Sequence, residues 1–251
     1  MKVALCFSGQ PRSIQEAAPY WYKNLLDHYD TDIFVHTWFS DGNIPESVTS
    51  IINDLKIYEG RIRKLDCEIP LNSTWINQKY PNVVSSQFPA VNTVSMFYSI
   101  FRSNLSRKMY QLEKSIDYDV VIRARFDYAL NNRFHLESIG KNPYLDEYIY
   151  VPDDVTNPNG SRDFCADTFA FGAPKVMDKY CQTFNNLDIL YDNGIPMNGE
   201  DMLSANLNIY SLTGKHMQLL HMNNPFPPGK YNGNYHSIIR TDFKNFNTLR
   251  G

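Results

Sequence analysis

Two arginines and an aspartate alternate in the segment Arg123-Ala-Arg125-Phe-Asp127. We predict a β-strand over residues 119–126, and on a strand these three alternate side chains would share one face. Two guanidinium groups and a carboxylate are costly to bury unless they pair with one another or bind an ion. The arginines could hold phosphates, and Asp127 could hold Mg²⁺ or Mn²⁺, which prefer oxygen ligands. The alternative is a structural Arg–Asp network.

A second candidate anion site is the segment Ser8-Gly-Gln-Pro-Arg12, directly after the apolar run 3–7. In a parallel α/β sheet, ligands bind beyond the carboxyl ends of the strands. Gly9 would let a phosphate approach the backbone, and the Arg12 guanidinium can donate two hydrogen bonds to a diphosphate. The segment is neither a phosphate loop of the GxxxxGK(S/T) type nor a dinucleotide fingerprint, which needs three glycines. A plain strand-to-helix turn is an equal alternative.

Acidic side chains in the second half of the chain could serve as a general base. Glu200 and Asp201 open a predicted helix, where a carboxylate could accept the proton of a hydroxyl group or simply stabilise the helix start through its dipole. Adjacent helical residues point about 100° apart, so the two carboxylates cannot share one direction, and we favour Asp201. Asp163 and Asp167, just before another predicted strand, are similar candidates.

Three isolated ring side chains are weaker candidates. Trp38 ends the second predicted strand, where a base or a sugar could stack on it, although a single aromatic residue is more often part of the core. His221 and His236 could complete a metal shell or contact a phosphate, but a histidine in a loop is usually only solvated.

Composition limits the classes of protein that need to be considered. With 251 residues, 43% of them hydrophobic, the chain can bury a full core, and its net charge of −3 supplies no basic field for nucleic acid. Four scattered cysteines without a C-x-x-C pair fit a reducing compartment and form no zinc motif. The first apolar run is too short for a signal peptide or a membrane span, so we expect a cytoplasmic protein.

The hydrophobic pattern predicts an α/β fold with a mainly parallel sheet flanked by helices. Strand, helix and strand follow one another at the N-terminus, and Ser13 is the expected N-cap of the first helix. We expect strands and helices at residues 3–7, 13–29, 32–38, 94–115, 119–126, 148–152, 168–172, 175–190 and 200–208. Residues 41–92 are expected to form short strands and loops, and the tail 223–251 to wrap the surface or cover a site.

Taken in order, several stretches resemble the small GT-A-type glycosyltransferases of large DNA viruses, phages and bacteria, which build surface glycans. The stretches are ALCFSGQPRS, YDTDIFVHTW, SMFYSIFRSN, YDVVIRARFDYAL, DTFAFGAPKVMDKY and GEDML. The resemblance implies a Rossmann-like mixed sheet in a single domain, 1–251. Residues 1–130 would bind a nucleotide-sugar donor, with a UDP-sugar favoured, and residues 131–251 a carbohydrate acceptor. The implied enzyme is a hexosyl- or deoxyhexosyltransferase.

The same resemblance implies roles for individual residues. The residues that look like the donor site are Ser8, Gly9, Arg12, Tyr98, Ser99, Arg102, Arg125 and Asp127. Trp38 and Arg123 join this predicted donor site on the strand-end argument given above. The segment 125–127 looks like the Asp-x-Asp slot that holds Mn²⁺ or Mg²⁺, but Arg125 replaces its first aspartate, which leaves Asp127, with His236 as a possible second ligand. Asp201 looks like the base of an inverting enzyme, followed by Glu200 and Asp167.

Two other functions remain open from the sequence. A sulfo- or phosphotransferase would also need arginines at strand ends, although the phosphate loop is missing. A non-catalytic domain that binds glycans or nucleotide sugars could keep the fold and lose the chemistry, and the loss of the first aspartate in the 125–127 segment favours it.

The donor assignment predicts the effect of Arg12→Ala. Loss of a charge-assisted hydrogen bond should weaken nucleotide binding by about 1.5–3 kcal/mol. Isothermal titration of UDP into the wild-type and Arg12→Ala proteins would measure the change, with circular dichroism to show that both are folded. Unchanged affinity in a folded variant would remove Arg12 from the site.

Overall fold

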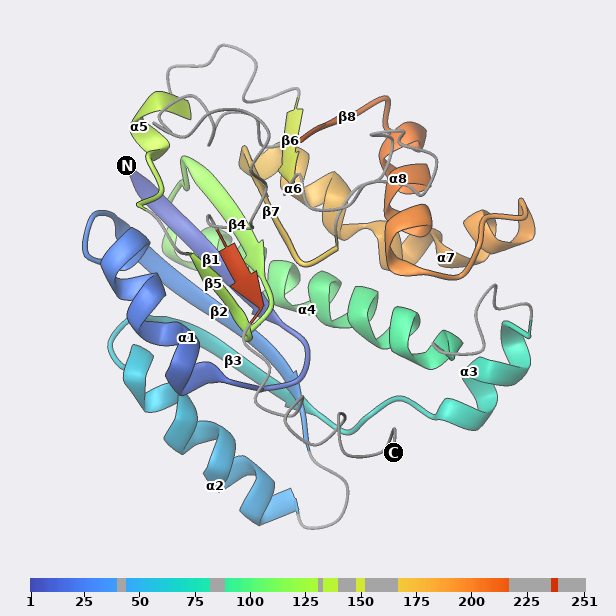
Figure 1. Ribbon diagram of the computed structural model, residues 1–251, viewed down its shortest axis with the longest axis horizontal. Helices are drawn as coiled ribbons and strands as arrows, with labels where there is room; N and C mark the ends of the chain where they lie inside the picture. Colours follow the sequence, from blue (N-terminus) through green and yellow to red (C-terminus); the bar gives the residue numbers. More distant parts are fainter. Residues whose placement is uncertain are drawn as a thin grey trace, which may run out of the picture.

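The computed structural model describes residues 1–39, 44–81, 89–130, 133–139, 148–151, 167–216 and 236–238, with a seven-stranded sheet at its centre (Figure 1). The strand order is β3-β2-β1-β4-β7-β6-β8. The strands are β1 Lys2–Ser8, β2 Asp30–Trp38, β3 Ile62–Glu68, β4 Val120–Ala124, β6 Tyr148–Val151, β7 Phe169–Gly172 and β8 Thr213–His216. The first four in spatial order are parallel, β7 runs antiparallel to β4 and β6, and β8 is parallel to β6. The predicted mixed, mainly parallel α/β sheet is therefore confirmed.

Helices cover both faces of this sheet. They are α1 Ile14–Trp21, α2 Ile44–Leu55, α3 Ser73–Lys79, α4 Ala90–Lys114, α5 Leu136–Ile139, α6 Pro174–Cys181, α7 Thr183–Asp192 and α8 Gly199–Ile209. A π-helical turn, Tyr22–Leu26, extends α1, and a 3₁₀ turn, Lys56–Tyr58, follows α2. The short strands β5 Tyr128–Leu130 and β9 His236–Ile238 form a separate antiparallel pair. In Figure 1 this pair lies on the same side of the sheet as α1.

Alternation along the central strands divides the buried side chains into two hydrophobic clusters. In β1, Val3, Leu5 and Phe7 pack with α1 and α2, whereas Ala4 and Cys6 face the other cluster, built from α3, α4 and α6 to α8. The same alternation continues in β2 and β4. Ser8 of β1 and His36 of β2 continue the alternation of Ala4, Cys6 and Phe34. Their side chains therefore face α4.

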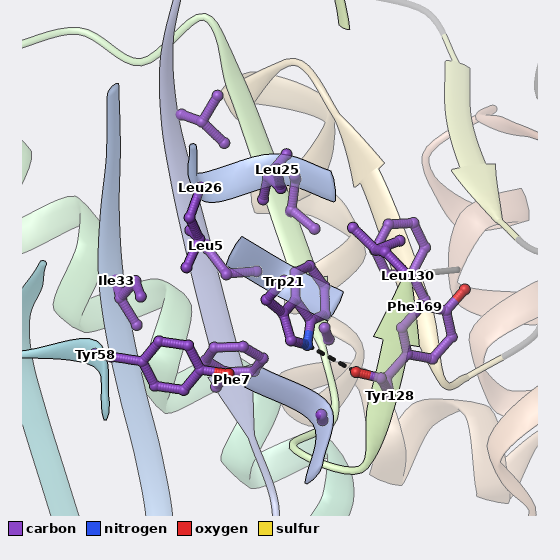
Figure 2. Close-up of a cluster of buried hydrophobic side chains, with 14 of the residues drawn as sticks. Leu5, Phe7, Trp21, Leu25, Leu26, Ile33, Tyr58, Tyr128, Leu130 and Phe169 are labelled. Carbon is purple, nitrogen blue, oxygen red and sulfur yellow. Dashed lines mark hydrogen bonds between the residues drawn. The ribbon is translucent and has the colours of Figure 1, made fainter. Parts of the chain in front are cut away.

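The β5 strand is held to α1 by two side chains. Trp21 Nε1 donates a hydrogen bond of 2.7 Å to the Tyr128 carbonyl oxygen, as Figure 2 shows, and Asn24 in the π-helical turn donates one to the Leu130 carbonyl oxygen. Trp21 is fully buried, and its ring meets Phe7 edge to face at 5.3 Å. These bonds fix the backbone that directly follows the Arg125–Asp127 segment.

The buried face of α4 is unexpectedly polar in its second half. Arg107 is buried there and pairs with Asp178 of α6, while Asn104 donates to the same carboxylate at 2.9 Å. The apolar residues Met109 and Leu112 point to solvent instead and are 61% and 79% exposed. The predicted helix is therefore present, and in its second half an ion pair with α6 is buried while these two apolar side chains are exposed.

Several predicted boundaries were wrong. Residues 41–92, expected to be short strands and loops, contain the 12-residue helix α2 and the parallel edge strand β3. The start of α1 is as predicted, because Ser13 is its N-cap residue, although Ser13 has a left-handed φ of 52° and its side chain makes no capping hydrogen bond. The predicted helix 175–190 is two helices, α6 and α7. The predicted tail, 223–251, lies outside the described residues apart from β9.

No helix among the described residues is long and apolar enough to cross a membrane.

The bond between Trp21 and β5 can be tested by Trp21→Phe. Loss of the donor leaves the buried Tyr128 carbonyl without this partner, which should lower the free energy of unfolding by about 1–3 kcal/mol. Chemical denaturation would measure this, with Trp75→Phe as the matched control because Trp75 is 58% exposed. Equal effects of the two substitutions would show that the hydrogen bond contributes nothing to stability.

Candidate functional site

The candidate site lies at the carboxyl ends of the parallel strands, on the side that faces α4. The chain runs from β1 outward to β2 and β3, then crosses back to β4 on the other side of β1. In open α/β sheets, ligands bind where the strand order reverses in this way. The register places Ser8 of β1 opposite His36 of β2 and Phe7 opposite Ala124 of β4, so all three strands end at this edge.

The turn after β1 is held from three directions. Gly9 has a φ of 112°, which favours glycine, and its N–H donates to Ser99 Oγ at 2.7 Å and to the His36 carbonyl oxygen at 3.2 Å. Thr37 Oγ1 donates to the Gly9 carbonyl oxygen at 2.9 Å. A Cβ at Gly9 would meet no atom of the described residues within 4 Å, and Arg12 is exposed. The turn is therefore fixed in shape while its outer side stays open.

His36 links this turn to β3 through α4. Its Nδ1 lies 2.8 Å from Ser99 Oγ, and its Nε2 lies 3.4 Å from Glu68 Oε1 without hydrogen-bond geometry. Burial lowers the pKa of the imidazole to about 4, although Glu68 opposes this shift. His36 is therefore neutral at pH 7, and its side chain acts as a hydrogen-bonding support for Ser99.

Glu68 joins the residues that we expected to face the nucleotide. It accepts hydrogen bonds from Tyr98 Oη at 2.7 Å and pairs with Arg102 Nη2 at 2.9 Å. Trp38 stacks on Tyr98, with ring centroids 5.5 Å apart, and is only 7% exposed. Trp38 thus packs in the core, with little surface for a base or sugar. Glu68 was missed because residues 41–92 gave no clear strand pattern, and its place at the end of β3 follows from the pairing with β2.

Arg123 joins the turn after β1 to the second half of the chain. This arginine is 1% exposed, its Nε donates to Ser8 Oγ at 3.1 Å, and its Nη1 donates to the Asp167 carbonyl oxygen. A buried guanidinium needs such acceptors, because an unpaired charge in the interior is very costly. The Arg123 guanidinium therefore holds Ser8 and the backbone of Asp167 close to each other.

The Asp167 carboxylate in turn contacts the start of α8. A Cβ built on Gly199 would overlap with Asp167 Oδ2 and would lie 3.1 Å from Met96 Cε. A larger residue at position 199 would displace the Asp167 carboxylate from this place, and a helix N-terminus favours negative charge. The predicted carboxylates Asp167, Glu200 and Asp201 are thus brought to the same edge as the β1 turn.

Asp201 has a structural partner of its own. Asn198 caps α8: its Oδ1 accepts from the Asp201 N–H at 2.8 Å, and its Nδ2 donates to Asp201 Oδ2 at 2.5 Å. Asp201 and Glu200 are both half-buried. The reciprocal pair fixes the orientation of the Asp201 carboxylate and accounts for one of its oxygens.

Arg125 and Asp127 bind each other through both oxygens of the carboxylate. Contrary to the prediction, their side chains do not share one face of a strand with Arg123. The β4 strand ends at Ala124, and residues 125–128 form a turn in which the Tyr128 N–H donates to the Arg125 carbonyl oxygen at 3.3 Å. Arg125 Nε and Nη2 donate to the two Asp127 oxygens at 2.9 and 2.6 Å. This is the Arg–Asp network that the sequence left open as an alternative.

The described side chains do not fit a divalent cation at Asp127. Both of its carboxylate oxygens accept from Arg125, and no group of three His, Cys, Asp or Glu residues among the described residues could hold a metal ion. His236 pairs with Leu130, at the end of the β5–β9 ladder away from Asp127, and its side chain is not described. Asp163 and His221 lie outside the described residues. The Mn²⁺ or Mg²⁺ site stays a prediction.

Buried polar atoms without a hydrogen-bond partner also gather at this edge. Within the described parts of the chain, His36 Nε2, Arg102 Nε and Thr168 Oγ1 have none. Most buried polar atoms in proteins have a partner, so such atoms call for an explanation.

No model of a known protein family matches the sequence, and no curated protein is similar to it in sequence. Solved structures that are similar include an active-site mutant of LgtC, with a TM-score of 0.48 and 12% identity over 93% of this chain and 81% of that one. The galactosyltransferase LgtC with donor and acceptor sugar analogues gives 0.45 and 12%, over 82% and 69%. The apo form of the glycosyltransferase GlyE of Streptococcus pneumoniae TIGR4 gives 0.41 and 14%, over 86% of this chain and 45% of GlyE.

The contact between Asp167 and Gly199 predicts a change of sign in a double-mutant cycle. Gly199→Ala should lower the free energy of unfolding of the native protein, because the new Cβ overlaps with the Asp167 carboxylate. In an Asp167→Ala background, the same substitution should be neutral or stabilising by up to about 1 kcal/mol, the helical preference for alanine over glycine. Chemical denaturation of the four proteins measures both effects, and equal effects in the two backgrounds would contradict the contact.

Proposed function

We propose that this protein is a glycosyltransferase that moves a sugar from a nucleoside-diphosphate donor to a hydroxyl group of a carbohydrate acceptor. The observation that carries the proposal is the position of Arg123, whose guanidinium binds Ser8 of the β1 turn and the Asp167 carbonyl. It joins an open, glycine-containing turn to a group of carboxylates at the start of α8. Donor phosphates need cations and an open backbone, whereas the acceptor hydroxyl needs a carboxylate, and this edge offers both.

The donor diphosphate fits best beside the turn at residues 8–12. No described residue covers the outer side of Gly9, and Arg12 is exposed nearby. Phe7 pairs with Ala124, so the residues that come next, Ser8 and Arg125, lie at the same edge of the sheet. As the bond to the sugar breaks, its electron pair passes to the diphosphate, and these guanidinium groups would stabilise the growing negative charge. UDP is the preferred nucleotide from the sequence resemblance.

The acceptor hydroxyl attacks the anomeric carbon from the side opposite to the diphosphate and must lose its proton as it attacks. Asp201 is our proposed base, because Asn198 fixes its carboxylate at the start of α8. Asp167 is the alternative, since it lies against the same helix start and is held through its carbonyl by Arg123. Glu200, the neighbour of Asp201 on the helix, points in another direction.

A second function has one observation in its favour. Arg125 occupies the carboxylate of Asp127, the one acidic residue left in the predicted metal slot. A domain that binds nucleotide sugars or glycans without catalysis would keep the same fold and the same turn. Transfer of sugar, rather than binding, separates this alternative from the enzyme.

The donor can be identified by thermal shift with UDP-, GDP-, dTDP- and CMP-sugars, because a ligand that binds the native state raises the melting temperature. With that donor, Asp201→Asn should keep binding and lose transfer by about 10²–10⁴-fold, the worth of a positioned base. Asp167→Asn tests the alternative base, and Glu200→Gln is the matched control, which should do less harm.

Wild-type transfer by Asp201→Asn together with loss of transfer by Asp167→Asn would move the base to Asp167. Binding of a nucleotide sugar without transfer to any glycan acceptor would favour the non-catalytic domain. A product that retains the anomeric configuration would contradict direct attack and therefore any base in this position.

A further inference from the structure

We infer that Arg125, oriented by Asp127, is the cation that binds the donor diphosphate at the end of β4, and that Asp127 is a positioning residue and not a metal ligand. The inference rests on the proposed function and specifies which side chain binds the negatively charged diphosphate of the donor. It departs from the sequence prediction, in which Asp127 holds Mn²⁺ or Mg²⁺.

The geometry of the pair supports this assignment. Arg125 Nε and Nη2 bind the two Asp127 oxygens side by side, which is the strongest arrangement of a guanidinium and a carboxylate. Asp127 is 3% exposed, whereas the Arg125 side chain is 22% exposed. The carboxylate is therefore the buried member, and the guanidinium is the member that a ligand can reach.

A divalent cation would compete poorly at this carboxylate. It would have to displace a bidentate guanidinium and would then lie beside the displaced positive charge. Mg²⁺ needs several oxygen ligands in a near-octahedral arrangement, and the described side chains provide no such group around Asp127. The arginine already neutralises the buried carboxylate, so a metal ion is not needed for that purpose.

Arg125 still has hydrogen-bond donors for an anion. A guanidinium carries five N–H donors, and Asp127 takes one from Nε and one from Nη2. The backbone of Arg125 is also fixed, since its N–H donates to the Thr168 carbonyl oxygen at 3.3 Å. The remaining N–H groups of a fixed, planar guanidinium suit two oxygens of a phosphate, and holding the group in advance lowers the entropy lost on binding.

The first arm of the test uses Mn²⁺ alone. Electron paramagnetic resonance of Mn²⁺ titrated with the wild-type protein and with Asp127→Asn reports ion binding without any nucleotide. We expect the two proteins to give the same signal. Mn²⁺ binding by the wild type that is lost in Asp127→Asn would make Asp127 a ligand and overturn the inference.

The second arm uses inorganic pyrophosphate in the presence of EDTA, followed by isothermal titration. Arg125→Gln should weaken binding by about 10- to 100-fold, the loss of a charge-assisted bond. The charge-matched double variant, Arg125→Gln with Asp127→Asn, should show the same loss and avoids leaving an unpaired buried carboxylate. The matched control is Arg63→Gln, which breaks the pair with Asp32 at the opposite end of β2 and should leave affinity unchanged.

Pyrophosphate affinity that is unaltered in a folded Arg125→Gln protein, or no binding by the wild type in EDTA, would overturn the role of Arg125. The proposed function fails by a different result, namely the absence of sugar transfer while both arms give the expected outcome. The two ideas can therefore be rejected separately.

Discussion

A buried guanidinium, that of Arg123, is the constraint on which the arrangement of this protein depends. An arginine that is 1% exposed must have acceptors, and it finds them in Ser8 Oγ and the Asp167 carbonyl oxygen. These two acceptors come from segments more than a hundred residues apart, one from the β1 turn and one from the entry to β7. The hydrogen bonds of this one guanidinium therefore join the β1 turn to the entry of β7, in addition to the ladders that pair β4 with β1 and with β7.

The long helix α4 packs on the sheet through Val94, Phe97 and Ile100, and it also supports the same edge through polar contacts. Ser99 holds the Gly9 turn and the neutral His36, while Tyr98 and Arg102 hold Glu68 at the end of β3. Further along, Arg107 pairs with Asp178 of α6. These hydrogen bonds and ion pairs join α4 to the β1 turn, to β2, to β3 and to α6.

The charges at the edge are distributed in a way that suits group transfer. Guanidinium groups lie at the ends of β1 and β4, and carboxylates lie at the start of α8, with Arg123 between them. An anionic leaving group and a hydroxyl that must lose a proton have opposite requirements, and separate positions for cations and carboxylates meet both. The pairing of Arg125 with Asp127 neutralises the buried carboxylate and fixes the orientation of the guanidinium.

The sequence by itself determined the strands around residues 3–7 and 32–38 and the long helix, because these depend on local periodicity. The rule for parallel sheets gave the prediction that a site lies at the strand ends. Only the tertiary structure decided how the charges pair. Alternation suggested one face for Arg123, Arg125 and Asp127, but β4 ends at Ala124, so Arg123 turns to Ser8 and Arg125 to Asp127. The sequence also did not predict the pairing of Glu68 with Arg102 or the contact between Asp167 and Gly199. Both join residues far apart in the chain and leave no local pattern.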